Sequence, residues 1–231
     1  VPGENDYRGG GVSTCATCDG FLYRDEDVLV VGGGDTAMED ALVLARTSKS
    51  VVVIHRRDEF RASRVLAQRV LEHPKIRVMW NSTVEAFEGE TVEVTGEDNA
   101  TIASQETLTH VVVRDGNDGR TTKLRVAAAF VAIGHDPNTG LVAEQIDVDD
   151  AGYVLTKHPT TVTSVDGVFA AGDVADHIYR QAVTSAGTSC RAALDAERRL
   201  SEHGARAERD ALVDDIMSEV KTQSGSLEND D

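Results

Sequence analysis

Cysteine is scarce in this sequence of 231 residues, which contains only three. Three cysteines are too few for a disulfide-scaffolded domain, in which several bridges replace a hydrophobic core. Cys15 and Cys18 stand close together in "CATCDG" and are followed at once by Asp19, whereas Cys190 lies far along the chain. A close pair of this kind is a metal clip, a structural bridge or a redox dithiol, and the surrounding residues must decide between them.

Long apolar runs are also lacking, and no charged-then-apolar signal segment opens the chain. Because a membrane-spanning helix needs about 20 apolar residues in a row, we predict a cytoplasmic protein that has no membrane partner. The first residue is Val1 and not Met. This start indicates processing, a truncation, or a longer chain of which the sequence is a part.

Basic residues are few, with 23 Lys and Arg against 40 Asp and Glu, a net charge of -17. Such a surface repels nucleic acid and anionic membranes, so neither is an expected partner. Lysine is especially rare, with 5 against 18 arginines, and Asp outnumbers Glu by 23 to 17. The balance indicates either an ordinary solvated acidic surface or a halophilic protein in a salt-rich cytoplasm, where screening weakens the repulsion between carboxylates.

The apolar residues that are present alternate between strand and helix patterns. "VLVV" at 28–31 predicts a buried strand, "GGGDTA" a turn into a helix, and "VVVI" at 51–54 a second strand, which together make a βαβ unit. A helix is expected over 59–73. Further strands are expected at 76–80 and 128–134, and between them short runs at 84–87, 91–95, 110–114 and 122–126 predict an inserted β-meander.

Beyond residue 134 the pattern becomes weaker. Short strands are expected at 152–155 and 167–173, and a long helix at 179–200. Leu212, Ile216 and Val220 are spaced four apart, which predicts a weak amphipathic helix before a frayed acidic end.

The glycine turn matches the pattern G-x-G-x-x-A through Gly32, Gly34 and Ala37. The first glycine permits the tight turn, the second lets a pyrophosphate approach the backbone, and the alanine lets the helix pack closely on the strand. The helix N-terminus then faces the phosphates. Many glycine turns are only turns, but the βαβ setting favours dinucleotide binding.

The end of the second strand carries His55, Arg56 and Arg57, and Arg61 follows one helical turn later. An NAD site usually has a carboxylate here, on the ribose hydroxyls. A cationic cluster in an otherwise acidic chain instead suits the 2′-phosphate of NADPH. A surface basic patch is the alternative interpretation.

The cysteine pair has no companion ligands for zinc, which needs about four. A structural bridge between residues 15 and 18 would close a loop too small to stabilise much. A redox dithiol therefore remains, with Asp19 placed to move a proton. In "GVFAAGDV" Gly172 and Asp173 end a predicted strand, where the carboxylate either binds a sugar or ribityl hydroxyl or simply caps the next helix.

Taken together, five segments resemble bacterial-type, low-molecular-weight thioredoxin reductase from about Gly11 to Leu200. The segments are "GVSTCATCDGFLYR", "VVGGGDTAMEDAL", "IHRRDEFRAS", "FVAIGHDPNT" and "GVFAAGDVADHIYRQAVTSAGTSCRAALDAERRL". The resemblance implies that electrons pass from NADPH to FAD, then to Cys15 and Cys18, and then to thioredoxin. It also implies that Cys18 lies against the flavin, that Cys15 attacks the thioredoxin disulfide, and that Asp19 is the acid on the flavin side.

The resemblance also implies the cofactor contacts, and it includes no metal site. For NADPH they are Gly32, Gly34, Asp35, Thr36, Ala37, His55, Arg56, Arg57 and Arg61, and for FAD they are Gly172, Asp173, Arg180, Gln181 and Ala182. Gly134 is a further cofactor contact, not assigned to one of the two.

The implied fold class is α/β. Residues 1–133 form a Rossmann-like NADPH domain with the inserted β-meander and the CxxC pair. Residues 134–201 form the C-terminal part of a second Rossmann-like, FAD-binding domain, and residues 202–231 form an acidic, partly disordered extension. The family has two glycine fingerprints and this sequence has one, so we expect an N-terminally incomplete chain that is inactive alone. The resemblance also implies that the full-length protein is a homodimer.

Two other functions remain open at this point. One is a related flavoprotein with another dithiol partner, such as the reductase of a peroxiredoxin system or a small-dithiol oxidase. The other is an NADP(H)-binding module in which the cysteines are idle or regulatory.

Overall fold

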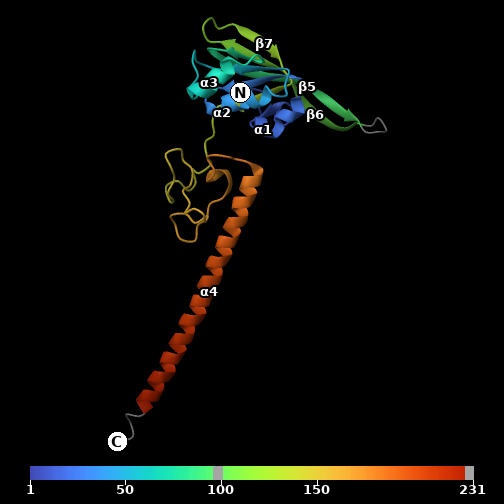
Figure 1. The fold of residues 1–231 in the computed structure, drawn as a ribbon. Helices are drawn as coiled ribbons and strands as arrows, with labels where there is room; N and C mark the ends of the chain where they lie inside the picture. The colour runs from blue at the N-terminus through green and yellow to red at the C-terminus, as the bar shows by residue number, and fades with distance from the viewer. Residues whose placement is uncertain (96–100, 227–231) are drawn as a thin grey trace. The chain divides into compact units, whose positions relative to one another are not determined.

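The computed structural model describes residues 1–95 and 101–226, and the chain separates into two compact units, Val1–Gly134 and His135–Asp231. Each unit is described by itself (Figure 1). Within the described residues, no helix is both long and apolar enough to cross a membrane.

A five-stranded parallel sheet organises the first unit, in the strand order β1-β8-β2-β3-β4. The strands are β1 (Val12–Ser13), β2 (Asp27–Gly32), β3 (Ser50–Ile54), β4 (Ile76–Met79) and β8 (Ala128–Ala132). The helices are α1 (Ala16–Asp19), the 3-10 helix η1 (Gly20–Tyr23), α2 (Asp35–Leu44) and α3 (Arg64–Leu71). The predicted βαβ arrangement is confirmed.

A second, antiparallel sheet contains the predicted meander, with β5 (Ser82–Thr95), β6 (Thr101–Asp115) and β7 (Thr121–Arg125). The strands are longer than the short runs in the sequence, because β5 continues without a break through two of the predicted runs. The first half of β6 was not predicted. Figure 1 shows the β5–β6 hairpin extending beyond the rest of this unit.

Neighbouring residues of β2 belong to two different apolar clusters, one on each face of the parallel sheet. Val28 and Val30 of β2 belong to one apolar cluster, together with residues of α2 and α3. Leu29 between them belongs to another cluster, which includes residues of β5 and β6. Because successive side chains of a strand point to opposite faces, the helices cover one face and the antiparallel sheet covers the other.

The helix predicted over 59–73 is shorter in the structure, where α3 begins at Arg64. Residues 55–63 form a loop, since their polar groups bond to the glycine turn after β2. The amides of Arg61 and Ala62 both donate to the carbonyl of Gly33, over 2.8 and 3.1 Å.

The second unit contains no strand ladder among its described residues. The prediction of strands at 152–155 and 167–173 is wrong. Val154 forms only an isolated bridge to Val148, and Phe169 forms only an isolated bridge to Val162. Isolated pairs of this kind have too few neighbours to form a sheet. The helices of this unit are the 3-10 helix η2 (Gly172–Val174) and one long helix, α4 (Ala182–Ser226).

Helix α4 begins at Ala182, three residues later than the start of the helix predicted over 179–200, and then continues without interruption through most of the acidic extension. The separate amphipathic helix predicted around Leu212, Ile216 and Val220 is therefore part of α4. We predicted a frayed end over residues 225–231, of which the first two belong to α4 and residues 227–231 lie outside the described part of the chain. The disorder predicted for the extension therefore stays a prediction.

Candidate functional site

The candidate site of the first unit lies at the carboxyl edge of its parallel sheet. Parallel strands end at the same edge, and ligands of open α/β sheets bind there, where the chain connections diverge to opposite sides. Cys15 follows β1, Gly33 follows β2, His55 follows β3 and Ile133 follows β8. The topology therefore brings the glycine turn, the arginine cluster and the cysteine turn to one edge.

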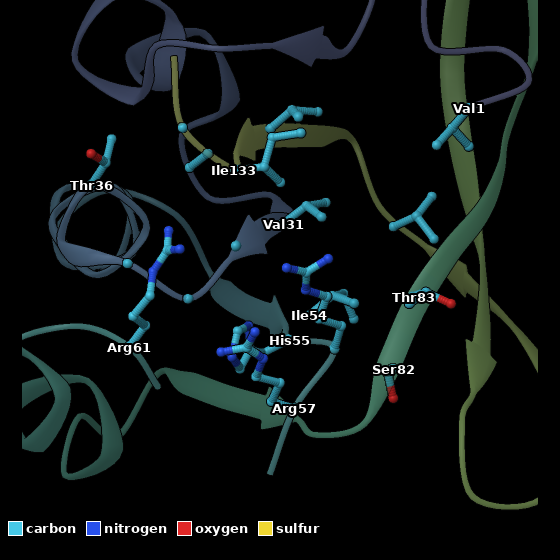
Figure 2. A pocket seen from close by; sticks show the side chains of 18 of the residues that line it. Val1, Val31, Thr36, Ile54, His55, Arg57, Arg61, Ser82, Thr83 and Ile133 are labelled. Atoms are coloured by element: carbon cyan, nitrogen blue, oxygen red, sulfur yellow. The ribbon is translucent and has the colours of Figure 1, made fainter. Parts of the chain in front are cut away.

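A cavity of about 720 Å³ lies at this edge. Its lining includes the glycine turn, the three arginines and the first residues of β5. Figure 2 shows His55 and Arg57 close together, and Arg61 pointing toward the first turn of α2, which carries Thr36. Ligand pockets in proteins usually have volumes of about 300–1,000 Å³, so the cavity has room for a nucleotide.

The glycine turn is closely packed at Gly32 and open at Gly34. A β-carbon at Gly32 would overlap the Ala132 carbonyl and lie 2.8 Å from the Ala37 β-carbon, so the strand and helix require glycine here. At Gly34 the nearest atom to such a carbon is the Arg61 guanidinium, at 3.8 Å. Gly34 thus leaves space for a ligand beside the N-terminus of α2.

Gly33 has a role that the sequence did not reveal. A β-carbon there would overlap the imidazole of His55, which is only 8% exposed. His55 Nε2 is 2.9 Å from the Glu59 carbonyl, and the ring packs against Phe60 and Trp80. His55 also lines the cavity, so its predicted contact with the cofactor stays a prediction, and the structure adds that its ring packs against Gly33.

Burial lowers the pKa of His55, the Glu59 carbonyl partly opposes this shift, and the positive charges of Arg57 and Arg56 lower the pKa further. The neutral imidazole is therefore the form that the folded protein favours at neutral pH. Neutral His55 leaves the phosphate-binding charge to the arginines.

Arg56, Arg57 and Arg61 are exposed, and none of them forms an ion pair within residues 1–95 and 101–226. Three unpaired guanidinium groups beside a cavity form a strong site for a dianion. Asp35, predicted to contact the cofactor, lines the cavity and accepts a hydrogen bond from the Ser63 amide at 2.6 Å. This bond holds the start of α3 against the first turn of α2.

Cys15 and Cys18 form a disulfide, with their Cα atoms 5.3 Å apart. Cys15 is half-buried and caps α1, its sulfur accepting from the Cys18 amide at 3.1 Å, whereas Cys18 is exposed. Asp19 is tied back to the strand before the turn, because its Oδ2 accepts from the Ser13 hydroxyl at 2.7 Å. In the described part of the chain, no cluster of His, Cys, Asp and Glu has the arrangement of a metal site.

The residues predicted to contact FAD lie in the second unit, at the start of α4. Asp173 accepts a hydrogen bond from the Ser185 hydroxyl at 2.9 Å. Arg180 has a positive φ of 48°, and its backbone amide donates to Asp176 at 3.1 Å. Backbone strain of this kind often marks functional sites.

The other predicted FAD contacts flank these two residues. Gly172 has a φ of 76° and donates its amide to Thr188, Gln181 donates its amide to Thr184, and Ala182 begins α4. Gly134, with a φ of 120°, is the last residue of the first unit. Gly134, predicted to contact a cofactor, lines the nucleotide cavity of the first unit.

Comparisons with known proteins agree with this geometry. The chain is 52% identical over 202 residues to a thioredoxin reductase of Mycolicibacterium smegmatis, covering 87% of this chain and 60% of that protein. A thioredoxin reductase of Streptomyces clavuligerus is 50% identical over 201 residues, with 87% and 58% covered. The chain thus spans about 60% of the length of these relatives, and the resemblance to thioredoxin reductases is confirmed.

Solved structures give the same result. The thioredoxin reductase of Streptococcus pyogenes matches with a TM-score of 0.75 and 35% identity, covering 87% of this chain and 61% of that one. That of Giardia duodenalis matches with a TM-score of 0.71 and 41% identity, with 87% and 61% covered. A family model described as pyridine nucleotide-disulphide oxidoreductase matches residues 1–189. The chain therefore belongs to the pyridine nucleotide-disulphide oxidoreductase family.

Proposed function

We propose that this chain is part of an NADPH-dependent flavoprotein disulfide reductase that passes electrons from NADPH through FAD to Cys15 and Cys18, and from there to thioredoxin. One observation carries the proposal. A disulfide and an arginine-flanked nucleotide cavity lie at the same carboxyl edge of one parallel sheet. The thioredoxin reductases named above support the choice of partner.

NADPH is the nucleotide that the cavity suits. The pyrophosphate would lie at Gly34, near the N-terminus of α2, where an added β-carbon meets almost no protein atoms. The 2′-phosphate would lie among Arg56, Arg57 and Arg61, which have no carboxylate partners in the described structure. Thr36 and Ala37 belong to the same first turn of α2, and Ala37 keeps that turn close to β2.

The two cysteines would have different tasks. In the proposed cycle, exposed Cys18 exchanges electrons with the flavin, and Cys15 attacks the disulfide of thioredoxin. Asp19 would supply or accept the proton on the flavin side, and its bond to Ser13 fixes the carboxylate beside the turn.

FAD, when bound, would relay two electrons between the nicotinamide and the disulfide. Asp173 would accept from a ribityl hydroxyl, and the segment of Arg180, Gln181 and Ala182 would lie over the ring. Arg180 is suited to this position because Asp176 accepts from the amides of Ile178, Tyr179 and Arg180 and so fixes the backbone there.

The oligomeric state, the cellular location and the adaptation to salt form a separate proposal. We infer a homodimer of the full-length protein in the cytoplasm, and an acidic surface suited to high salt. The net charge of -17 supports the last point.

Trapping a mixed disulfide would test the proposed reaction without requiring flavin. The two variants compared, Cys18→Ser and Cys15→Ser, both carry Cys190→Ser, because Cys190 is an exposed free thiol. In the Cys18→Ser variant, Cys15 should then displace the leaving thiol of a thioredoxin whose active-site cysteine has been activated with thionitrobenzoate. We expect a covalent complex that a reducing agent dissolves. The Cys15→Ser variant is the matched control and should react more slowly, since Cys18 does not have the attacking role. Equal rates for the two variants would contradict the assigned roles, and no complex with either would contradict the choice of thioredoxin.

A further inference from the structure

Asp40 is a carboxylate in an unexpected place. It lies on the second turn of α2 and accepts a hydrogen bond from the backbone amide of Ala16, the residue after Cys15. Ala16 is 2% exposed and packs with Ala37, Ala41 and Leu44 in the apolar cluster under the helices. The carboxyl group therefore touches the disulfide turn from its buried side.

The second oxygen of this carboxylate has no partner. Asp40 Oδ2 is buried, and within the described residues it forms no hydrogen bond. Buried polar atoms are almost always hydrogen-bonded, so an exception needs an explanation. Helix capping does not provide one, because Cys15 itself caps α1 through its sulfur.

The charge state of Asp40 is also unusual. Burial raises its pKa from 3.8 to about 6, the Ala16 hydrogen bond opposes this rise, and the charge of Glu39 adds to it. The other titratable groups on α2 and on the elements packed against it are Asp35 on α2, Asp19 and, once the disulfide is reduced, Cys18 on α1, Tyr23 on η1, Asp27 on β2, and Arg64, Arg69 and Glu72 on or after α3. Asp27 is paired with Lys49, and Arg64, Arg69 and Glu72 are exposed.

We propose that Asp40 is a positioning residue for the redox pair, which holds the turn through the Ala16 amide and whose negative charge disfavours the thiolate of reduced Cys15. This inference rests on the proposed redox function of the pair. It adds a control on the reactivity of the dithiol that is located in the nucleotide-binding helix.

Reduction of the disulfide produces the nucleophile. A two-electron donor, either a dithiol reagent or a reduced flavin, breaks the Sγ–Sγ bond, and two protons complete the two thiols. Cys15 becomes a nucleophile when its thiol loses one proton. A carboxylate one peptide unit away, in apolar surroundings, opposes that loss, whereas a protonated carboxyl group does not.

The test measures the reactivity of Cys15 and needs no enzyme turnover. The 231-residue chain is reduced with dithiothreitol, freed of reagent and alkylated with iodoacetamide at pH values from about 5 to about 8. Peptide mass spectrometry follows Cys15, and Cys190 on α4 serves as the internal reference. Asp40→Asn removes the charge and keeps an oxygen that can accept from Ala16.

At about pH 7 we expect Cys15 of the Asn variant to react roughly threefold faster than that of the wild type. A decrease of about one unit in the thiol pKa raises the thiolate population tenfold, and a Brønsted coefficient of about 0.4–0.5 cancels part of this gain. Below about pH 5 the ratio should approach one, because the carboxyl group of the wild type is then protonated. A merely structural role would give a ratio that does not depend on pH.

Two variants complete the design. Glu39→Gln makes the same charge change at the exposed neighbouring position and should leave the rate close to that of the wild type. Asp40→Glu keeps the charge and should retain the wild-type pH profile. A flat ratio for Asp40→Asn, or an equal effect of Glu39→Gln, would overturn the inference alone. If the chain contains no reducible disulfide, the proposed redox function fails, and the inference fails with it.

Discussion

At the scale of single residues, the two adjacent glycines Gly33 and Gly34 have opposite surroundings. Gly33 lies against the buried His55 ring, and Gly34 opens onto the cavity. Gly33→Ala should therefore destabilise the fold by about 1–3 kcal/mol, because the new methyl group overpacks the imidazole. Gly34→Ala should keep its stability and lose NADPH affinity, because its methyl group occupies the space of the pyrophosphate.

Urea denaturation and nucleotide titration on both variants separate these two effects. The two substitutions add the same atoms at neighbouring positions, so each is the control of the other. Equal stability losses would contradict the placement of His55, and an unchanged NADPH affinity of Gly34→Ala would contradict the pyrophosphate site.

The arginine cluster should determine the choice of nucleotide. Replacing Arg56 and Arg57 together by Gln should weaken NADPH binding far more than NADH binding, since each charge-assisted phosphate contact contributes about 1.5–3 kcal/mol. Titration by fluorescence gives both affinities. Arg77→Gln, an exposed arginine on β4, is the matched control and should change neither. Equal losses for the two nucleotides would refute the 2′-phosphate assignment.

Asp40 should give the folded protein a characteristic pH dependence. Its pKa is about 6 when folded, against 3.8 as the ordinary value. The folded state thus binds more protons, and the stability from this group is full below about pH 4 and is lost as the pH rises through about 6. Two pKa units correspond to about 3 kcal/mol, so the free energy of unfolding of Asp40→Asn should gain that amount relative to the wild type between about pH 4 and pH 7. A difference that stays constant in denaturant titrations would contradict the raised pKa.

At the scale of elements, the longer parallel strands could be predicted from the sequence, whereas β1 and the first half of β6 could not. The runs at 28–31 and 51–54 are apolar throughout because both faces of β2 and β3 are buried, and such runs indicate a covered parallel strand. Strand β1 has only two residues, too few for any periodicity. The polar first half of β6 has many exposed side chains and therefore carried no burial signal.

The contact between α2 and α3 gives a prediction at this scale. The Asp35 carboxylate accepts the Ser63 amide at the N-cap of α3, where Ser63 itself makes no side-chain cap. Asp35→Ala leaves this amide unpaired, whereas Asp35→Asn keeps an acceptor oxygen. Thermal or urea denaturation should show the Ala variant to be less stable than the Asn variant by about 1 kcal/mol. Identical stabilities would mean that the hydrogen bond makes no net contribution.

At the scale of the whole chain, spacing in the sequence predicted the arginine cluster, the glycine loop and the dithiol, because each is a local pattern. It could not predict that His55 lies under Gly33 or that Asp40 touches the turn of Cys15, since these contacts depend on tertiary packing. A charged residue within a helix usually indicates a solvated face, and Asp40 breaks that rule.

FAD retention is the prediction that concerns the whole chain. The sequence contains one G-x-G-x-x-A loop, and its geometry suits NADPH. The described residues of the second unit contain isolated bridges and no strand ladder. The FAD pyrophosphate carries two negative charges and needs backbone donors of its own. We therefore expect the 231-residue chain, purified with excess FAD, to bind NADPH and to show little flavin absorbance. A stoichiometric flavin spectrum would contradict this expectation.

The pairing of β1 has a consequence for how the chain acquires its structure during synthesis. The parallel register joins Val12 to Ala129 and Ser13 to Phe130, and β8 is the sole sheet neighbour of β1 in the described structure. Contacts so distant in sequence form late, because a long loop must close first. The ribosome must therefore release β8 before the cysteine turn can dock on the sheet. Until then the turn of Cys15 and Cys18 is held by contacts that are nearer in the sequence, such as the hydrogen bond from the Ala16 amide to Asp40.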